Sequence, residues 1–90
     1  MYEEIAVKLK LSPEELERES LHLFLNHRLR LIESQLLSLA RKYRVQTVTE
    51  LDALVQSGQL HESEAFEDFF EFDHLEAERD AVLDSLKDLA

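Results

Sequence analysis

The fold is decided by the stretch SPEELERESLHLFLNHRLRLIESQLLSLARKY, which runs from Ser12 to Tyr43. Ser12 suits the N-cap of a helix, Pro13 suits its first position, and Glu15 completes a capping box. No residue that would end a helix follows until about Val45. The stretch therefore predicts one long helix that begins at Ser12.

An apolar seam runs along this predicted helix at alternating spacings of four and three, an a/d pattern about three heptads long. Its members are Leu25, Leu29, Ile32, Leu36, Leu39 and Tyr43. Such a seam is either a face of the core of one chain or the pairing surface for a second subunit, and both can hold together. Opposite it lie Arg30, Arg41 and Arg44, with Leu23 and Leu37 among them. We interpret these arginines as a solvated basic face; contact with an acidic segment or with nucleic acid are the alternatives.

The N-terminal residues alternate in polarity, with Ile5, Val7, Leu9 and Leu11 separated by Ala6, Lys8 and Lys10. This period of two predicts a short, half-buried strand. An isolated strand is not stable, so we expect it to pair with the same strand of a second copy.

The remaining chain predicts two further helices. Thr49 and Asp52 form a second capping signal, and Gly58 suits the end of a short helix. Residues 44–49 and 57–62 are the connectors, and a last helix begins at Ser63. The predicted fold is mainly α: a short N-terminal strand, one long helix, a short helix and a C-terminal helix, as an intertwined dimer. It forms a single domain, 1–90, with a strand and dimerisation helix in 1–45 and an acidic partner-binding region in 46–90.

Charge is distributed unevenly over the 90 residues, whose net charge is −10. Residues 1–44 carry eight Lys or Arg and seven Asp or Glu, which gives +1, whereas residues 45–90 carry two and thirteen, which gives −11. The C-terminal half should therefore repel nucleic acid and attract a basic partner.

Four of the five phenylalanines lie between Phe66 and Phe72, in a segment rich in carboxylates. On a helix, Phe69 and Phe72 share a stripe with Leu75, Val82 and other apolar residues, which predicts that this stripe is core. Phe66 and Phe70 point elsewhere, beside Ala77 and Ala81. They either pack on the long helix or form an exposed surface for a partner.

Carboxylates occupy the space between these two faces. Glu67, Glu71 and Glu78 share one side of the helix, and Asp73 and Asp80 share the other. Crowded carboxylates repel one another, and a basic partner would relieve that repulsion. The partner-binding residues that we predict are Phe66, Phe70, Glu67, Glu71, Asp73 and Glu78, with aromatic anchors and steering acids.

Two Glu-x-x-His pairs, Glu19 with His22 and Glu71 with His74, match the spacing of helical di-iron sites. A dimer that combines four helices could bring them together, so a metal-binding dimer is an alternative. The segment His61-Glu62-Ser63-Glu64 lacks the second His of a zinc-protease helix, and His27 is expected to be exposed. The sequence has no cysteine and only one glycine, which removes thiolate chemistry and glycine-rich phosphate loops.

The order of features resembles a family of small prokaryotic proteins often interpreted as antitoxins of toxin–antitoxin pairs. The resemblance rests on Arg41-Lys42-Tyr43, on Thr49-Glu50-Leu51, on Ser57-Gly58 and on Phe70-Glu71-Phe72-Asp73-His74-Leu75. Many members have Gly and Trp where Arg44 and Phe72 stand here. The resemblance implies that the acidic aromatic helix fills the basic groove of a toxin such as a ribonuclease. It also implies a two-stranded ribbon with Lys8 and Lys10 outward, which would contact operator DNA as ribbon-helix-helix proteins do.

We therefore predict a non-enzymatic, cytoplasmic interaction protein that needs no cofactor and acts as a homodimer on a basic protein partner. DNA is a weaker candidate for a partner, and no membrane contact is expected because no apolar run is long enough. A metal-binding dimer and a purely structural oligomerisation element are the alternatives.

Overall fold

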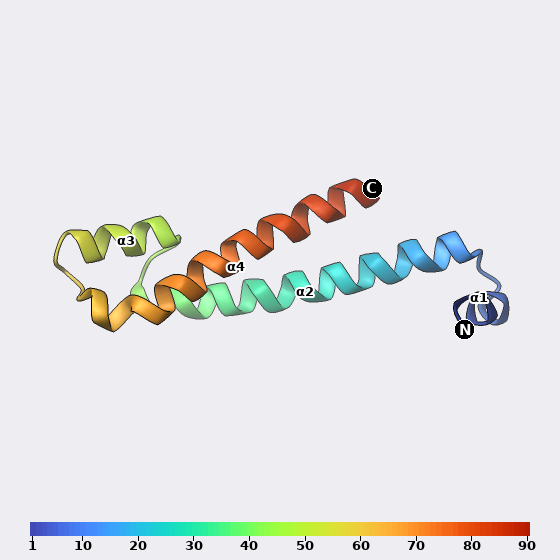
Figure 1. Cartoon of the computed structure of the whole chain (residues 1–90), viewed down its shortest axis with the longest axis horizontal. Coiled ribbons are helices and arrows are strands. Elements are labelled where there is room, and N and C mark those ends of the chain that lie inside the picture. Colours follow the sequence, from blue (N-terminus) through green and yellow to red (C-terminus); the bar gives the residue numbers. More distant parts are fainter.

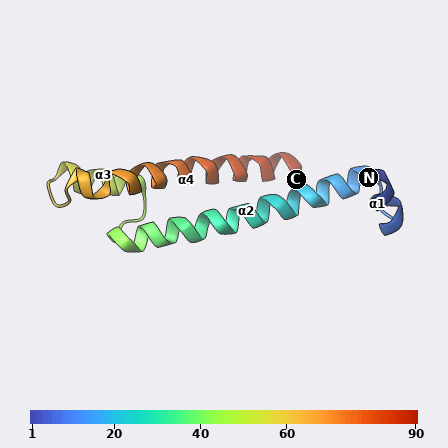
Figure 2. The same cartoon turned by 60° about the horizontal axis from the view of Figure 1, so that its bottom comes forward.

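The computed structural model describes residues 1–90, which form four α-helices and no strand. These helices are α1 (Tyr2–Leu9), α2 (Pro13–Tyr43), α3 (Val48–Gln56) and α4 (Glu62–Leu89). The two long helices run antiparallel as a hairpin, with α3 beside the start of α4 at one end and α1 at the other (Figure 1). A second view shows the same arrangement along the whole length (Figure 2). The molecule measures 60 × 19 × 17 Å.

The predicted N-terminal strand is wrong, because Tyr2–Leu9 is a helix. The same residues also satisfy a helical pattern: Tyr2, Ile5, Ala6 and Leu9 share one side, and Ala6 is buried. Glu3 and Glu4 in the first turn and Lys8 in the last complement the helix dipole. Without a strand there is no two-stranded ribbon, so Lys8 and Lys10 do not lie on its outward face. Lys8 lies in the last turn of α1, and Lys10 is its left-handed C-cap.

The start of α2 is confirmed. The hydroxyl of Ser12 accepts a hydrogen bond from the backbone N–H of Glu15 at 3.0 Å, and Pro13 is the first helical residue. The helix ends at Tyr43, where Arg44 adopts a left-handed conformation with φ 55°. The next N–H, that of Val45, then bonds back to the carbonyl of Ala40 at 3.0 Å. This closing turn redirects the chain towards α3.

The capping signal of α3 lies two residues earlier than predicted. Thr47, not Thr49, is the N-cap, and its hydroxyl accepts from the N–H of Glu50 at 3.2 Å. The Glu50 carboxylate accepts in turn from the N–H of Gln46 at 2.6 Å. The predicted stop is confirmed, since α3 ends at Gln56 and Gly58 has φ 80°.

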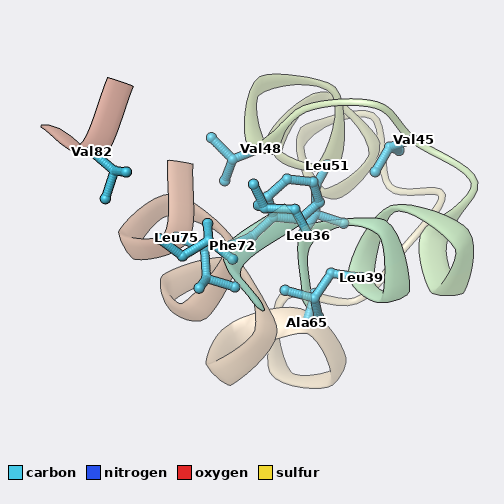
Figure 3. Close-up of a cluster of buried hydrophobic side chains, with 10 residues drawn as sticks. Leu36, Leu39, Val45, Val48, Leu51, Ala65, Phe72, Leu75 and Val82 are labelled. Atoms are coloured by element: carbon cyan, nitrogen blue, oxygen red, sulfur yellow. The ribbon is translucent and has the colours of Figure 1, made fainter. Parts of the chain in front are cut away.

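One core cluster holds the chain together (Figure 3). It contains ten buried residues from α2, the α2–α3 connector, α3 and α4: Ile32, Leu36, Leu39, Val45, Val48, Leu51, Ala65, Phe72, Leu75 and Val82. Phe72, Ile32 and Leu51 are the largest side chains that are almost fully enclosed. They bring α2, α3 and α4 together at one end of the hairpin.

The seam of α2 is filled by α4 of the same chain. Ile32, Leu36 and Leu39 belong to the core cluster, and Leu25, Leu29 and Tyr43 pack against it. Of the two interpretations of this seam, the structure shows the core of a single chain. A dimer seam at the same positions stays a prediction, and Leu25, Leu29 and Tyr43 are only partly buried there.

The hairpin has a closed half and an open half. In α2 no residue before Ile32 is buried, and in α4 none after Val82 is buried. We call residues 13–31 of α2 with residues 83–89 of α4 the open half, and the remaining hairpin with α3 the closed half. The radius of gyration is 18.7 Å, whereas a compact domain of this length has about 12 Å. None of the helices combines the length and apolar content needed to span a membrane.

Candidate interaction surface

Phe66 and Phe70 lie uncovered on α4. Their side chains are 54% and 56% exposed, and their rings meet edge to face with centroids 5.0 Å apart. Phe72, by contrast, is 1% exposed, and Phe69 packs against the core cluster. The predicted division of this segment into a core face and an outer face is confirmed.

Three of the predicted partner-binding carboxylates lie within three residues of Phe70 along α4 and have no opposing charge. Glu67, Glu71 and Asp73 are exposed and form no ion pair. Together with Phe66 and Phe70 they make up what we call the acidic–aromatic surface. It combines an uncovered aromatic pair with negative charge that nothing in the chain neutralises.

Glu78 differs from these three carboxylates, because Arg28 of α2 already neutralises it. The Nε of Arg28 donates to Glu78 Oε1 at 2.6 Å, and His74 Nε2 lies 3.9 Å from the other oxygen of that carboxylate. Glu78 therefore holds α4 to α2, and its contact with a partner stays a prediction. Asp80, which was predicted to share a side of α4 with Asp73, also has a basic neighbour, because its Oδ1 lies 3.5 Å from Arg79 Nε.

Asp68 has a structural role that sequence reasoning missed. Its Oδ2 accepts from Lys42 Nζ at 2.6 Å and from the Tyr43 hydroxyl at 2.5 Å. The Lys42 ammonium, and next the Tyr43 hydroxyl, hold the pKa of the Asp68 carboxyl below its usual value. Burial, and next the bond to Asp68, raises the pKa of Tyr43. Asp68 lies four residues before the buried Phe72 and seven before the buried Leu75. Residues at these spacings share one side of a helix, so the sequence could have indicated that Asp68 faces the rest of the chain.

Glu76 is a second acid with a structural role. Its carboxylate accepts from the backbone N–H of Val48 at 3.0 Å, at the start of α3. A carboxylate at this place satisfies an unpaired helix N–H and complements the helix dipole. Three acids of α4, Asp68, Glu76 and Glu78, thus fasten α4 to α2 and α3, whereas the acids of the acidic–aromatic surface have no such contact.

A small recess adjoins the exposed rings. Its volume is about 110 Å³, and its wall combines Phe66, Phe69 and Phe70 with Val55 of α3 and with Asp52, Glu62 and Ala65. The recess is mostly apolar and has two carboxylates at its edge. It has the size of a single side chain and the charge to favour a basic one.

The two Glu-x-x-His pairs do not meet. Glu19 and His22 lie near the start of α2, and Glu71 and His74 lie in the half of α4 that pairs with the other end of α2. No three His, Asp or Glu side chains converge anywhere in the chain. A shared metal would need ligands from more than one copy.

A second recess is basic. It has a volume of about 620 Å³ and lies between the end of α2 and α4, where Arg41 and Arg44 are joined by Arg79. Leu36, Leu37, Ala40 and Val45 form its apolar part, and Glu33 is its one acid. Two of the three arginines predicted to share a face are therefore brought together here, and Arg30 is not among the residues of this recess. Arg79 could not be foreseen, because it comes from the acidic helix.

The whole chain, residues 1–90, matches one family model. The chain belongs to the Uncharacterized protein MJ0235 family. The match spans all four helices and therefore includes the hairpin, the acidic–aromatic surface and the basic recess. Neither a curated protein nor a solved structure matches the chain.

Proposed function

We propose that the protein is a non-enzymatic interaction module that binds a basic protein partner through the acidic–aromatic surface. One observation carries the proposal: two phenylalanines, each more than half exposed, touch each other amid carboxylates that no residue of the chain neutralises. Exposed aromatic pairs are costly in water and are typical anchors of interfaces.

The charge of α4 defines the partner. Eleven Asp or Glu and two Lys or Arg lie in Glu62–Leu89, a balance of −9. Asp68, Glu76, Glu78 and Asp80 are engaged within the chain, and the other seven remain to steer a partner. A basic groove would gain favourable electrostatics and a faster association rate, while an acidic or nucleic-acid partner would be repelled.

We further propose that the partner is a toxin of the ribonuclease type and that the protein acts as its antitoxin. This part rests on the resemblance to antitoxin-like proteins in the segment from Phe70 to Leu75. A helix with exposed rings and carboxylates can occupy a basic RNA-binding groove, because its charge imitates that of the phosphates it displaces. Neutralisation would then be competitive with RNA.

The test is co-expression with the product of the neighbouring reading frame. We expect the two proteins to co-elute in size-exclusion chromatography, and the wild-type chain to relieve growth arrest caused by that product. The double variant Phe66→Ala/Phe70→Ala should lose both effects while keeping its helicity in circular dichroism, because both side chains are exposed.

The matched control is Leu23→Ala/Leu37→Ala, which removes two exposed apolar side chains from α2. It should co-elute as the wild type does. Co-elution that survives the phenylalanine double variant, or that the control abolishes equally, would show that the acidic–aromatic surface is not the binding site.

A further inference from the structure

A second uncovered apolar surface lies on α2, in the open half. Leu21, Phe24 and Leu31 are 41%, 61% and 45% exposed. Their spacings of three and seven place them along one side of α2, next to the seam that α4 fills. We call these three residues the α2 stripe. It is separate from the acidic–aromatic surface, which lies on α4.

The spacing of the stripe fits a neighbouring helix that lies along α2. Phe24 and Leu31 are one heptad apart, so both can contact the same neighbouring helix, as successive d residues of a coiled coil do, and Leu21 lies three residues before Phe24 as an a residue would. A helix with two adjoining apolar seams packs against two neighbours in a bundle. α4 is the first neighbour, and the chain contains no helix in the position of the second.

The surface area agrees with a missing neighbour. The chain exposes 6973 Å², whereas a folded monomer of its 10.6 kDa mass exposes about 5,500 Å². The excess of about 1,500 Å² per chain is within the range that an obligate homodimer buries on each partner. It is almost twice what one side of a standard interface buries, which is about 800 Å².

The charges near the stripe permit a second copy, despite the net charge of −10. Residues 20–32 contain no Asp or Glu at all. The cation nearest the centre of the stripe, Arg28, is already paired with Glu78, so two copies would not bring two unpaired guanidinium groups together. This part of α2 thus adds no carboxylate to the contact, and the acids Glu14, Glu17 and Asp88 lie only around Leu21, at one end of the stripe.

The ends of α2 are complementary to each other. Residues 13–19 contain four Glu and one Arg, a balance of −3, and residues 41–44 contain two Arg besides Lys42, which Asp68 neutralises, so a balance of +2 remains. Antiparallel pairing of two α2 helices places each acidic end near a basic end, whereas parallel pairing places like charges together. Antiparallel helix dipoles also attract.

We propose that the α2 stripe is covered by α2 of a second copy, antiparallel to the first about a two-fold axis near Arg28. In this register Phe24 of each copy meets Leu31 of the other. Each α2 then has its own α4 on one side and the other α2 on the next. The contact does not use Phe66 or Phe70, so it stands independently of the proposed partner.

Light scattering coupled to size-exclusion chromatography tests the proposal. The wild-type chain is expected at 21.2 kDa, twice its 10.6 kDa. Phe24→Glu should raise the dimer Kd by about 1,000-fold, because it removes an aromatic contact twice in a symmetric interface. The control Leu23→Glu changes the preceding residue, which is 73% exposed and points away from the stripe, and it should leave the mass unchanged.

Circular dichroism separates loss of pairing from loss of fold. Both variants should keep the wild-type helicity, because both positions are exposed. A wild-type chain that stays at 10.6 kDa at several hundred micromolar overturns the proposal. So does an oligomer that Phe24→Glu leaves intact, or one that both variants disrupt equally.

Single cysteines test the orientation, because the chain has none of its own. His27 lies beside the proposed axis, so His27→Cys should be cross-linked to its counterpart by a short bismaleimide. Ser38→Cys should not, because two such residues lie about 32 Å apart along antiparallel helices in this register. Cross-linking at both positions would indicate parallel helices and contradict the charge argument.

Discussion

The closed and open halves of the hairpin are built from the same two helices and differ in what covers them. In the closed half α3 adds a third layer, and Phe72, Leu51 and Ile32 are at most 1% exposed. In the open half the apolar pattern continues, yet its leucines stay partly exposed because only two helices meet there. A two-helix layer cannot enclose side chains on its own. The closed half therefore stabilises the fold, and the open half leaves the α2 stripe exposed, where we propose that a second copy pairs.

The largest expected effect is that of Phe72→Ala, which leaves a cavity among α2, α3 and α4. It should lower the free energy of unfolding by about 3–5 kcal/mol, a large part of the stability of a small domain. Leu86→Ala, in the partly buried open half, should cost about 1 kcal/mol. Urea unfolding followed by circular dichroism measures both. If the two substitutions prove equally costly, the two halves are equally well packed and the comparison fails.

Amide exchange should separate the halves without any substitution. Amides of the closed half should exchange only through global unfolding, and those near Phe24 should exchange faster. If α2 pairs with α2, a hundredfold rise in concentration should slow exchange near Phe24 about tenfold, or about 1.4 kcal/mol, because the monomer fraction of a tight dimer falls with the square root of concentration.

Phe24→Glu supplies the control for this concentration dependence, which it should abolish. Neither the rise in protein concentration nor Phe24→Glu should alter exchange near Leu51. This holds at concentrations where global unfolding does not yet require the dimer to dissociate. Protection near Phe24 that equals that of Leu51 at every concentration would mean that the open half is stable alone.

Sequence reasoning predicted the helices well and their partners poorly. The start of α2 and the end of α3 depend on residues close in sequence, Ser12 with Glu15 and Gln56 with Gly58, and these were found. The strand was wrong because residues 5–9 fit both the period of two and a helical pattern, and the packing of Ala6 decides between them. The a/d seam was found, but a seam does not say whether its neighbour belongs to the same chain.

The candidate site was predicted where it depends on helical geometry and missed where it depends on contacts between distant residues. The division between Phe72 and the outward Phe66 and Phe70 follows from helical geometry and was correct. Contacts between distant parts of the chain decide which carboxylates remain unpaired. Lys42 and Asp68 are separated by 26 positions in the sequence, and Arg28 and Glu78 are separated by 50. Sequence alone counted Glu78 among the free acids because nothing local indicates Arg28.

Asp68→Asn should have a moderate effect in the closed half, about 1 kcal/mol at neutral pH, because the charge-assisted bonds to Lys42 and Tyr43 are partly exposed to solvent. The folded pKa of Asp68 is lowered, so its contribution is present above the ordinary value near 4 and is lost as pH falls through the lower folded value. The raised pKa values of Lys42 and Tyr43 act oppositely: their contribution is present below about 10 and is lost as pH rises further.

Urea unfolding at several pH values measures this effect, and Asp73→Asn is its control, since Asp73 is exposed and unpaired. The control should change stability little at neutral pH, and Asp68→Asn should flatten the loss of stability in acid. An acid profile that is the same for Asp68→Asn and wild type would remove Asp68 from the set of residues that fasten α4 to α2.

The smallest effects come from two residues in the left-handed conformation, one in the closed half and one at the end of α1, outside both halves. Arg44, with φ 55°, closes α2 beside the core, and Lys10, with φ 60°, closes α1 at the far end. Glycine adopts this conformation without a steric penalty, so Arg44→Gly should raise the free energy of unfolding by about 0.5–1 kcal/mol. Asn also tolerates the left-handed conformation, so Arg44→Asn should give a smaller gain in the free energy of unfolding. A gain that follows this order reports the backbone conformation and not merely the loss of the arginine side chain.

Lys10→Gly should reduce fraying of α1 without changing the global free energy of unfolding, because α1 lies outside the core cluster. Equal gains from Arg44→Gly and Lys10→Gly would mean that α1 unfolds together with the closed half, so that the open half between them is also part of one cooperative unit.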